Sequence, residues 1–447
     1  MAFSGLDIYK LLPKTNCRKC GFPTCLAFAM QLAKKAVSVE KCPEITAAAK
    51  AALEASAQPP IKLITVGEGE QKLEIGNENV LFRHEEKFFH PAGVGIIIND
   101  AASDEEIKNR VEHVNKLSFE RIGQQISVNL IAVRQAGSDK ARFEAVVKKV
   151  AELTKLGIVL ISADAASLKA AAAHIAKRKP IIHAANKENY QELAAAAKEL
   201  SLPLVVKADT LEELSELIPA VNSAGANDLI LQTGDKPVNK KIWDLTQIRR
   251  MPLKKNNRVF GYPSLTVIKS NDTYEQVIEA CDYILKYTGI VLLEGFEAYQ
   301  ILPILTLRQN IYTDPQKPLQ VEPKAYPIGQ VNENSPVLIT TNFSLSYYTV
   351  LGEVEASKIP AFLISVDTEG MSVLTAWAAE KFTPDKINES IKKFGIPEKV
   401  KHKNIVIPGY VAVMSGDLEE KSGYRIIVGP REAAGIPSFL KNIQKAG

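Results

Sequence analysis

The chain has 447 residues, of which 46% are hydrophobic and 24% are charged, and its formal net charge at pH 7 is +4. This composition is typical of a globular protein with enough length for more than one hydrophobic core. The near-balanced charge gives no electrostatic basis for binding nucleic acid or a membrane surface. No apolar run reaches the eighteen or so residues that span a bilayer, and the N-terminus lacks an apolar signal core. We therefore expect a cytoplasmic protein without nucleic-acid or membrane partners.

Four of the five cysteines fall in the first tenth of the chain, within residues 12–43. Their spacing is C-x2-C-x4-C-x16-C, formed by Cys17, Cys20, Cys25 and Cys42. The first three lie on a short stretch containing Gly21 and Pro23, residues that permit a tight loop. The apolar positions that follow, in "LAFAMQLAKKAV", have helical periodicity, so a helix should carry the chain away before the fourth cysteine returns.

In a reducing compartment such a group of thiols binds metal or does redox chemistry more often than it forms disulfides. Zinc usually takes two C-x2-C pairs, whereas here there is one such pair and three thiols share one loop. A 4Fe-4S cubane fits this three-plus-one pattern better. Structural zinc and unliganded thiols remain as alternatives at this point.

The next region predicts an eight-stranded β/α (TIM) barrel. A Pro-Pro break after helix-forming residues 47–57 predicts a domain boundary near residue 58, which separates an iron-sulfur domain (1–58) from a barrel domain (59–322). Strands with continuous apolar character, as in a parallel sheet covered by helices, are expected at 94–99, 126–133, 157–162, 180–184, 203–208, 228–232, 258–262 and 289–294. Helical patterns such as residues 190–201 and 210–225 separate them.

Polar residues follow several of these strands, where a barrel normally carries its activity. They are Asp164, Asn186, Asp209, Thr233 and Glu294, with His183 at one strand end. The sequence around these residues contains no second group that would identify any of them as a catalytic acid or base. We interpret most of them as helix caps and His183 as a residue whose hydrogen bonds stabilise the fold. We therefore assign no catalytic residue.

A proline-rich stretch at 312–329 predicts a stiff linker, followed by a smaller α/β domain at 323–447. Strands are expected at 335–342, 360–368, 403–410 and 424–430, with helices at 345–358, 372–381, 385–395 and 431–443. This alternation predicts a doubly wound, Rossmann-like sheet whose ligands bind beyond the carboxyl ends of the strands. The linker suggests rigid-body movement of this domain about residues 312–329.

The turns at those carboxyl ends, "TTNFS", "TEGMS", "PGYVA" and "GPREAAG", combine glycines, hydroxyls and small side chains. Backbone amides at the helix starts after Gly370 and Gly429 could hold an anionic or polar ligand edge, and small side chains would let a large planar ligand approach. The same turns could equally be ordinary capped loops.

Residues 12–43 closely resemble the iron-sulfur segment of the large subunit of the corrinoid iron-sulfur protein, the acetyl-CoA decarbonylase/synthase gamma subunit. The order of cluster segment, barrel and "TTNFSLSYYTV … VGPREAAGIPSFL" domain agrees along essentially the whole chain. The resemblance implies one 4Fe-4S cluster and one cobamide on the C-terminal domain. It also implies a smaller barrel subunit as partner in a heterodimer.

The function that the resemblance implies is that of a methyl carrier in the Wood-Ljungdahl (reductive acetyl-CoA) pathway. Cobalt as Co(I) would take a methyl group from methyltetrahydrofolate through a separate methyltransferase and deliver it to acetyl-CoA synthase. The cluster, fed by a low-potential electron donor or reactivator, would return Co(II) to Co(I). Two alternatives stay open, namely a barrel that is itself a folate methyltransferase and an electron-transfer subunit without corrinoid.

By the same resemblance Cys17, Cys20, Cys25 and Cys42 would bind the cluster. The corrinoid-binding residues would be Thr340, Ser346, Gly370, Met371, Ser372, Val373, Gly409, Arg431 and Glu432. Many cobalamin proteins ligate cobalt with a histidine from an Asp-x-His-x-x-Gly motif. None of the six histidines here, at positions 84, 90, 113, 174, 183 and 402, has that context. We therefore expect a base-off cobamide without a protein histidine ligand.

Overall fold

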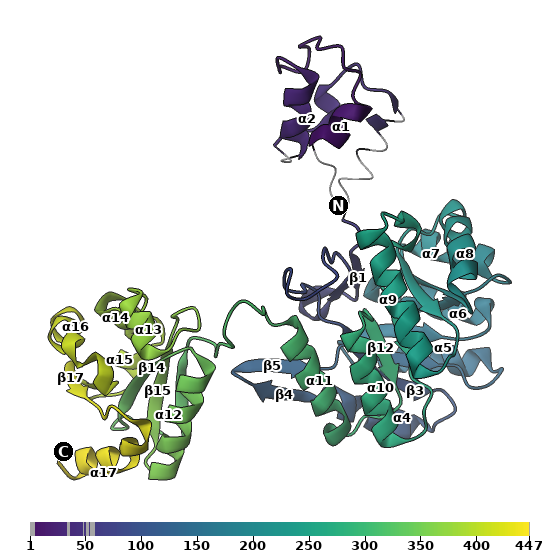
Figure 1. The fold of residues 1–447 in the computed structure, drawn as a ribbon. Coiled ribbons are helices and arrows are strands. Elements are labelled where there is room, and N and C mark those ends of the chain that lie inside the picture. The colour runs from purple at the N-terminus through teal and green to yellow at the C-terminus, as the bar shows by residue number, and fades with distance from the viewer. Residues whose placement is uncertain (1–4, 34–35, 48, 51–52, 54–58, 447) are drawn as a thin grey trace. The chain divides into compact units, whose positions relative to one another are not determined.

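The computed structural model describes residues 5–33, 36–47, 49–50, 53 and 59–446. It divides into two compact units (Figure 1). The barrel unit comprises Met1–Phe119 and Ser127–Tyr312, and the C-terminal unit comprises Glu120–Ile126 and Thr313–Gly447. The break predicted near residue 58 lies outside the described residues.

The N-terminal segment includes the helices α1 (Gly5–Leu11) and α2 (Cys25–Ala33) and a 3-10 turn, η1 (Val39–Lys41). The described residues 47, 49, 50 and 53 are also helical. Helix α2 begins where predicted, because Thr24 Oγ1 accepts a hydrogen bond from the amide of Ala27 at 3.1 Å and so caps the first turn. Phe28 and Ala29 are fully buried and form a small core with Ile8 of α1. This core gives the segment a fixed shape around its cysteines.

The barrel is an eight-stranded parallel sheet in the spatial order β10-β9-β8-β7-β6-β3-β12-β11. An isolated bridge between Leu231 of β10 and Ser264, next to β11, nearly closes it. Its strands are β3 (Gly93–Asn99), β6 (Leu130–Arg134), β7 (Gly157–Ile161), β8 (Ile181–Ala185), β9 (Leu204–Ala208), β10 (Leu229–Thr233), β11 (Leu265–Val267) and β12 (Ile290–Leu293). Most of their side chains are buried on both faces, which explains the continuous apolar runs in the sequence.

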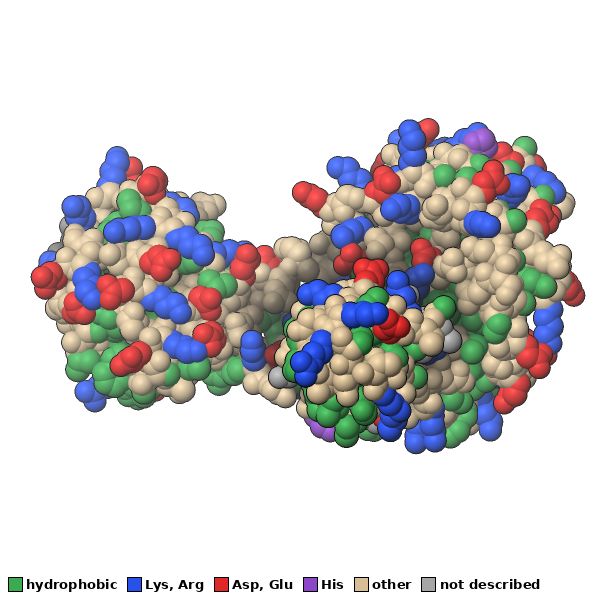
Figure 2. Space-filling model, turned by 90° about the horizontal axis from the view of Figure 1, so that it is seen from above, with side chains coloured by type: hydrophobic (Ala, Val, Ile, Leu, Met, Phe, Trp, Pro, Cys, Tyr) green, Lys and Arg blue, Asp and Glu red, His purple; other side chains and the backbone are tan. Residues whose placement is uncertain are grey.

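Helices follow the barrel strands in sequence, as the β/α pattern predicts (Figure 1). They are α4 (Asp104–Asn115), α5 (Lys140–Leu153), α6 (Ala165–His174), α7 (Tyr190–Leu200), α8 (Leu211–Ser223), α9 (Val238–Lys254), α10 (Thr273–Leu285) and α11 (Ala298–Tyr312). Short 3-10 turns, η3 (Ala176–Arg178) and η4 (Arg258–Phe260), interrupt the connections. Figure 2 shows acidic and basic side chains interspersed over the visible face rather than segregated by sign.

The strand predicted at 258–262 is wrong. Arg258–Phe260 is the 3-10 turn η4, and the strand of this β/α unit is β11, which begins two residues after Pro263. A Cβ on Gly261 would come within 2.9 Å of the carbonyl oxygens of both Arg258 and Pro60. The apolar run therefore packs beneath the barrel as a tight turn, with Phe260 buried.

A short antiparallel hairpin that the sequence did not reveal packs into the barrel interior. Its strands are β1 (Ile64–Val66) and β2 (Leu73–Ile75), linked by the turn η2 (Gly69–Gln71). Their buried side chains share one core cluster with the inward-facing residues of the eight strands. A Cβ on Gly93, the first residue of β3, would lie 2.5 Å from Leu73 Cδ2, so the hairpin packs against the amino end of the sheet.

The C-terminal unit contains a five-stranded sheet in the order β13-β15-β14-β16-β17, in which all pairings are parallel except that of β13 with β15. The strands are β13 (Ala325–Ile328), β14 (Val337–Thr341), β15 (Ala361–Val366), β16 (Asn404–Ile407) and β17 (Arg425–Val428). The helical elements are α12 (Ser344–Ser357), α13 (Val373–Ala378), α14 (Pro384–Lys393), α15 (Ile396–Lys399), η5 (Gly409–Met414), α16 (Ser415–Ser422), η6 (Ala433–Gly435) and α17 (Ile436–Ala446).

Two hydrophobic clusters show that both faces of this sheet are covered. Side chains of α12 and α17 pack with Leu338, Leu363 and Val406 on one face. Side chains of α14 and α16 pack with Ile339 and Ile364 on the other. The four predicted strands are confirmed, and the unit is a three-layer α/β sandwich.

The stretch predicted as a linker at 312–329 is only partly a linker. Tyr312 is the last residue of α11, and residues 325–328 form the edge strand β13. Pro327 is tolerated there because an edge strand has amide positions without a partner strand. Val321 is also held in place, since its amide donates to the carbonyl of Asn342 at 2.8 Å. The stretch between α11 and the first of these contacts is therefore shorter than the sequence suggested.

Candidate cofactor sites

The cysteine-bearing loop is built from a series of unusual backbone conformations. Asn16, Arg18 and Gly21 all have positive φ values, of 48°, 61° and 85°. The side chain of Asn16 reaches across the loop, and its Oδ1 accepts a hydrogen bond from the amide of Cys25 at 2.8 Å. This bond ties the start of the loop to the start of α2 and wraps the chain around the thiols between them.

The fourth cysteine is brought to this loop by η1 and by an ion pair. The Cys42 amide donates to the carbonyl of Val39 at 3.1 Å, and Lys19 Nζ lies 2.6 Å from Glu44 Oε1. Cys25 and Cys42 are buried, Cys20 is half-buried and Cys17 is exposed. Burial, followed by the charges of the three other cysteines, raises the pKa of the Cys42 thiol. The other three thiols are therefore close enough to Cys42 for their charges to affect its ionisation.

All four cysteines are free thiols rather than disulfides. Within the described ranges, no group of three or more His, Cys, Asp or Glu side chains is arranged to hold a metal ion directly. Four cysteine thiolates are the usual donor set of an iron-sulfur cluster.

A cavity of about 250 Å³ opens at the carboxyl edge of the C-terminal sheet. It lies beyond β14, β16 and β17 and continues between the sheet and helices α12 and α17, where its lining is apolar. Four of the predicted corrinoid-binding residues line it, namely Thr340, Ser346, Val373 and Arg431.

The other predicted residues surround the cavity without lining it. Gly409 lies between two lining residues, and a Cβ there would approach the carbonyl oxygen of Gly429 to 2.5 Å and the amide of Arg431 to 2.8 Å. Only glycine lets these two loops pack so closely. Glu432 accepts a hydrogen bond from the Tyr410 hydroxyl at 2.6 Å and so fixes a lining side chain. The remaining three, Gly370, Met371 and Ser372, belong to the turn between β15 and α13.

Three buried hydroxyls at this edge have no hydrogen-bond partner among the described residues, namely Thr340 Oγ1, Thr341 Oγ1 and Ser365 Oγ. Thr340 and Ser365 are direct neighbours across β14 and β15, so their side chains lie on the same face of the sheet, the one covered by α12. An unpaired buried hydroxyl costs about 1–3 kcal/mol. Hydroxyls that border a cavity would recover this cost when a ligand supplies the partner.

The residue that organises the neighbouring turn is Asn342, which the sequence analysis did not single out. Its side chain is buried, and Oδ1 accepts hydrogen bonds from the amides of Thr368 and Gly370, at 2.9 and 3.0 Å, and from the Thr368 hydroxyl at 3.0 Å. Nδ2 donates to Gln320 Oε1 and Asp367 Oδ1, both at 3.2 Å. The turn needs this support because Glu369 and Gly370 have φ values of 56° and 77°.

Large apolar side chains are exposed around the mouth of the cavity. Leu345 at the start of α12 is 67% exposed, and Val413 in η5 is 77% exposed. Tyr410, and Leu374 and Trp377 of α13, are also exposed. An apolar rim around a cavity is typical of a surface that receives a large ligand or a protein partner.

Comparison with known proteins identifies the family to which the chain belongs. A model of the CO dehydrogenase/acetyl-CoA synthase delta subunit family matches residues 63–440, and a model of an Fe-S cluster family matches residues 12–44. The large subunit of the corrinoid/iron-sulfur protein of Moorella thermoacetica is 47% identical over 441 residues, covering 99% of each chain. The chain belongs to the corrinoid/iron-sulfur protein large-subunit family.

Archaeal relatives in this family have a different name. The acetyl-CoA decarbonylase/synthase complex subunit gamma of Methanothermobacter thermautotrophicus is 34% identical over 456 residues and covers 99% of each chain. The family model is described as a delta subunit, whereas the full-length relatives are named large or gamma subunits. Because the match to these relatives includes the cysteine segment, the present chain groups with them.

A solved dihydropteroate synthase of Xanthomonas albilineans overlaps 56% of this chain and 100% of its own, with a TM-score of 0.40 and 14% identity. An overlap this low supports no inference about function. Among the described helices, none combines the length and apolar character needed to cross a lipid bilayer.

At the carboxyl edge of the barrel, the expectation that most polar residues are helix caps is confirmed for Asp164. It is wrong for Asn186 and Asp209, because the N-cap residues of α7 and α8 are Asn189 and Thr210. His183 Nε2 and Gln232 Oε1 are 2.6 Å apart, and burial lowers the pKa of His183 to about 4. Asp164 caps α6 through the amide of Ser167 at 2.8 Å, and Glu294 pairs with Arg134 at 2.5 Å.

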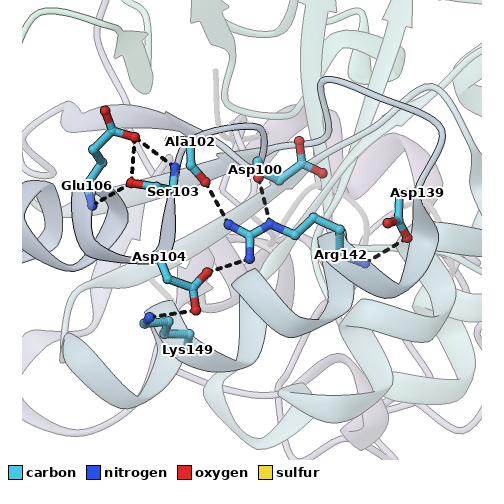
Figure 3. A network of polar contacts seen from close by, with 8 residues as sticks. All are labelled: Asp100, Ala102, Ser103, Asp104, Glu106, Asp139, Arg142 and Lys149. Atoms are coloured by element: carbon cyan, nitrogen blue, oxygen red, sulfur yellow. Dashed lines mark hydrogen bonds and ion pairs between the residues drawn. The ribbon is translucent and has the colours of Figure 1, made fainter.

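The loop that follows β3 is fixed by a similar network (Figure 3). Arg142 of α5 donates to the carbonyls of Asp100 and Ala102, at 3.0 and 2.7 Å, and to Asp104 Oδ1 at 2.5 Å. Ser103 and Glu106 form a capping box at the start of α4. In this member of the family these polar groups stabilise the barrel.

Proposed function

We propose that this chain is the methyl-carrying large subunit of a corrinoid iron-sulfur protein in the Wood-Ljungdahl pathway. The observation that carries the proposal is the full-length similarity to the large subunit from Moorella thermoacetica. The cysteine loop and the cavity of the C-terminal unit supply the two sites that this function needs. We assign the iron-sulfur domain to residues 1–58, the barrel to 59–322 and the corrinoid domain to 323–447, in a cytoplasmic protein.

Several features of this edge support a cobamide site. Gly409 lets the loops that follow β16 and β17 approach each other closely, and Asn342 fixes the turn that precedes α13. Thr340 offers an unpaired hydroxyl to the amide groups at the corrin periphery. Arg431 would place its positive charge near the phosphodiester of the nucleotide loop. The apolar lining residues, such as Leu338 and Ile436, would contact apolar parts of the cofactor.

The position of His402 supports our proposal that no histidine of the C-terminal unit ligates the cobalt. Of the six histidines in the sequence it alone falls within residues 313–447. Both of its ring nitrogens are engaged, Nε2 with the carbonyl of Ser335 at 2.9 Å and Nδ1 with the amide of Asn404 at 3.2 Å. Asn404 is the first residue of β16, so the imidazole lies at the amino end of the sheet, opposite the cavity mouth.

Cys17, Cys20, Cys25 and Cys42 would hold one 4Fe-4S cluster. The small core of α1 and α2 shields Cys25 and Cys42, and burial together with hydrogen bonding to sulfur is what sets the potential of such clusters. Cys17 is exposed, which gives the segment an open side toward a redox partner.

When bound, the cobamide supplies a cobalt that takes a methyl group as Co(I) and passes it on, and the cluster supplies the electron that returns Co(II) to Co(I). The chain itself binds and orients the cofactor and leaves its mouth open to partners. We propose as partners the small subunit, a methyltetrahydrofolate:corrinoid methyltransferase, acetyl-CoA synthase and a low-potential electron donor or reactivator. The exposed apolar rim that includes Leu345 and Val413 is the surface we assign to them.

Elemental analysis of anaerobically purified protein tests both sites. We expect about four irons and one cobalt per chain, and an electron paramagnetic resonance spectrum of Co(II) without nitrogen coupling from an axial base. Cys42→Ser should lose iron and keep cobalt. Zinc in place of iron, or failure to bind added cobamide, would overturn the proposal, and an iron-containing, cobalt-free protein would support the electron-transfer alternative.

A methyl-transfer assay separates the carrier from a barrel-based methyltransferase. The cobamide-loaded protein should be methylated by methyltetrahydrofolate only after a separate methyltransferase is added. Methylation by the chain alone would favour the second function. The structure offers that alternative little support, because His183, Gln232 and Glu294 at the barrel edge are bonded to one another or to Arg134.

A further inference from the structure

The excess positive charge of the chain is concentrated in its cysteine-bearing segment. Residues 1–58 contain eight Lys and Arg but only four Asp and Glu, so their formal net charge of +4 equals that of the whole chain. Residues 59–447 are therefore balanced. Because exposed charges are screened over about 10 Å at 0.1 M salt, a partner responds to a local excess of charge rather than to the total.

Some of these cations have no acidic partner within the segment. Each described acidic side chain of the segment pairs with a lysine, in the pairs Asp7–Lys10, Glu40–Lys50 and Glu44–Lys19. Among the described residues, Lys14, Arg18 and Lys41 form no ion pair with a carboxylate. Residues 14–19, which include the exposed Cys17, are all exposed and contain no acidic residue. Uncompensated positive charge therefore surrounds the most accessible thiol.

An exposed apolar surface adjoins this basic loop. Leu6 of α1 and Leu26 and Met30 of α2 are 57%, 37% and 44% exposed. Leu26 and Met30 are four residues apart, so they share one face of α2. Met30 also reaches the start of α1, because a Cβ on Gly5 would clash with its Sδ. These three apolar side chains therefore form one surface, which we call the α1–α2 patch.

The α1–α2 patch and the basic loop meet at the first turn of α2. Asn16 Oδ1 accepts a hydrogen bond from the amide of Cys25 at 2.8 Å, which places the loop beside the residue that precedes Leu26. Lys10 follows Leu6 by one turn of α1 and adds a cation next to the patch. Electron-transfer proteins usually meet through small interfaces, and complementary charge determines how fast such complexes form.

We propose that this face of the cysteine segment docks an acidic electron-carrier protein. The α1–α2 patch would lie at the centre of the interface, and Lys10, Lys14 and Arg18 would face carboxylates of the partner. The inference rests on the proposed function, because it assumes that the four cysteines hold a redox cluster. It adds the chemistry of the electron donor, which is an acidic surface around a small apolar centre.

Calorimetric titration of the anaerobic full-length protein with an acidic flavodoxin tests this surface, because binding is then measured without electron transfer. We expect the dissociation constant to rise about tenfold between about 25 and about 250 mM salt, since exposed charges are screened. Lys14→Glu should weaken binding about five- to tenfold at the lower salt concentration and much less at the higher one. Met30→Gln should weaken binding about three- to fivefold at both concentrations, because it removes apolar contact.

Lys148→Glu is the matched control, because Lys148 is exposed on α5 and the substitution changes the net charge by the same amount. It should leave the affinity unchanged. Should Lys14→Glu lose iron, Lys10→Glu reverses a charge farther in sequence from Cys17 and should weaken binding with the same dependence on salt.

Absence of binding, binding that is independent of salt, or an equal loss of affinity in Lys148→Glu would overturn the inference. An RNA oligonucleotide that binds as tightly as flavodoxin would also overturn it. So would a Lys14→Glu variant whose cluster potential shifts while its affinity stays unchanged, since the lysine would then compensate the charge of the cluster.

Iron content separates failure of this inference from failure of the proposed function. A protein purified without iron would overturn the assignment of the cluster. An iron-loaded protein without salt-dependent binding would overturn only the docking surface.

Discussion

The carboxyl edges of the two sheets carry similar polar side chains. The two edges differ in whether the hydrogen-bonding groups of these side chains have partners within the protein. In the barrel, His183 and Gln232 bond each other, and Ser162 donates to Gln135 Oε1 at 2.5 Å. In the C-terminal sheet, Thr340, Thr341 and Ser365 are buried at the same kind of position without partners, and Thr340 lines a cavity. These unpaired hydroxyls support our proposal that the ligand binds at the C-terminal edge.

Of the substitutions that test the difference between the two edges, Asn342→Ala should have the largest effect. The substitution removes one acceptor that serves three donors and frees a turn with two positive φ values. We expect the free energy of unfolding of the C-terminal unit to fall by about 2–4 kcal/mol and cobamide affinity to fall by about 10- to 100-fold. Urea unfolding and equilibrium titration with cobamide measure the two effects.

Gln232→Ala is the matched change at the barrel edge, since it also removes a buried amide that holds a neighbour. It should destabilise the barrel and leave cobamide affinity unchanged. Equal loss of affinity in both variants would mean that the two edges do not differ in function.

The pH dependence of the barrel should reflect His183. Its pKa in the folded protein, about 4, is below the unfolded value near 6.5, so the unfolded state binds more protons between these values. Barrel stability is then fully present above pH 6.5 and decreases as the pH falls toward 4, by about 2–3 kcal/mol at pH 4.5. His183→Gln should flatten this part of the profile, as measured by hydrogen exchange of β8 and β10 at pH 7 and 4.5. An unchanged slope would show that His183 is not held neutral.

Thr340→Val should have a smaller effect, which is favourable in the cofactor-free protein and unfavourable for cofactor binding. Without cofactor, removing an unpaired buried hydroxyl should stabilise the C-terminal unit by about 1 kcal/mol. With cofactor, loss of a hydrogen bond should weaken cobamide binding by about five- to tenfold. Thermal unfolding with and without cobamide measures both.

Ser162→Ala is the control for that experiment, because the Ser162 hydroxyl is already bonded. It should destabilise the barrel by about 1 kcal/mol whether or not cobamide is present. A stabilised Ser162→Ala protein would remove the distinction between the two edges.

Much of this architecture could be predicted from the sequence because the signals are local. Continuous apolar runs located seven of the eight barrel strands, and the glycine- and hydroxyl-rich turns pointed to the edge where the cavity lies. The strand prediction at 258–262 is wrong because its apolar residues form a turn. The close approach of Gly261 to Pro60, which explains this turn, is visible only in the structure.

What the sequence could not show depends on contacts between distant residues. Asn342 follows a strand like many capping residues, and its importance arises from donors 26 and 28 positions later. The hairpin of β4 (Ser118–Arg121) and β5 (Gln124–Ser127) is similar, because its Ile122-Gly123 turn is a weak signal in the sequence and its packing against the cluster that contains Tyr347 appears only in the structure. A positive φ at a β-branched residue was the sign that could have been sought, and it is visible only in three dimensions.

The edge strand β13 has a practical consequence for aggregation and for isolating the C-terminal domain. The unpaired backbone groups of an open sheet edge can hydrogen-bond to another chain, and a proline hinders such pairing because it has no amide donor. Pro327 sits in the strand that covers β15, whose Leu363 and Ile364 are fully buried. A truncated domain that begins after Ile328 would uncover β15 and self-associate, whereas one that begins before Gln320 keeps its own edge protected.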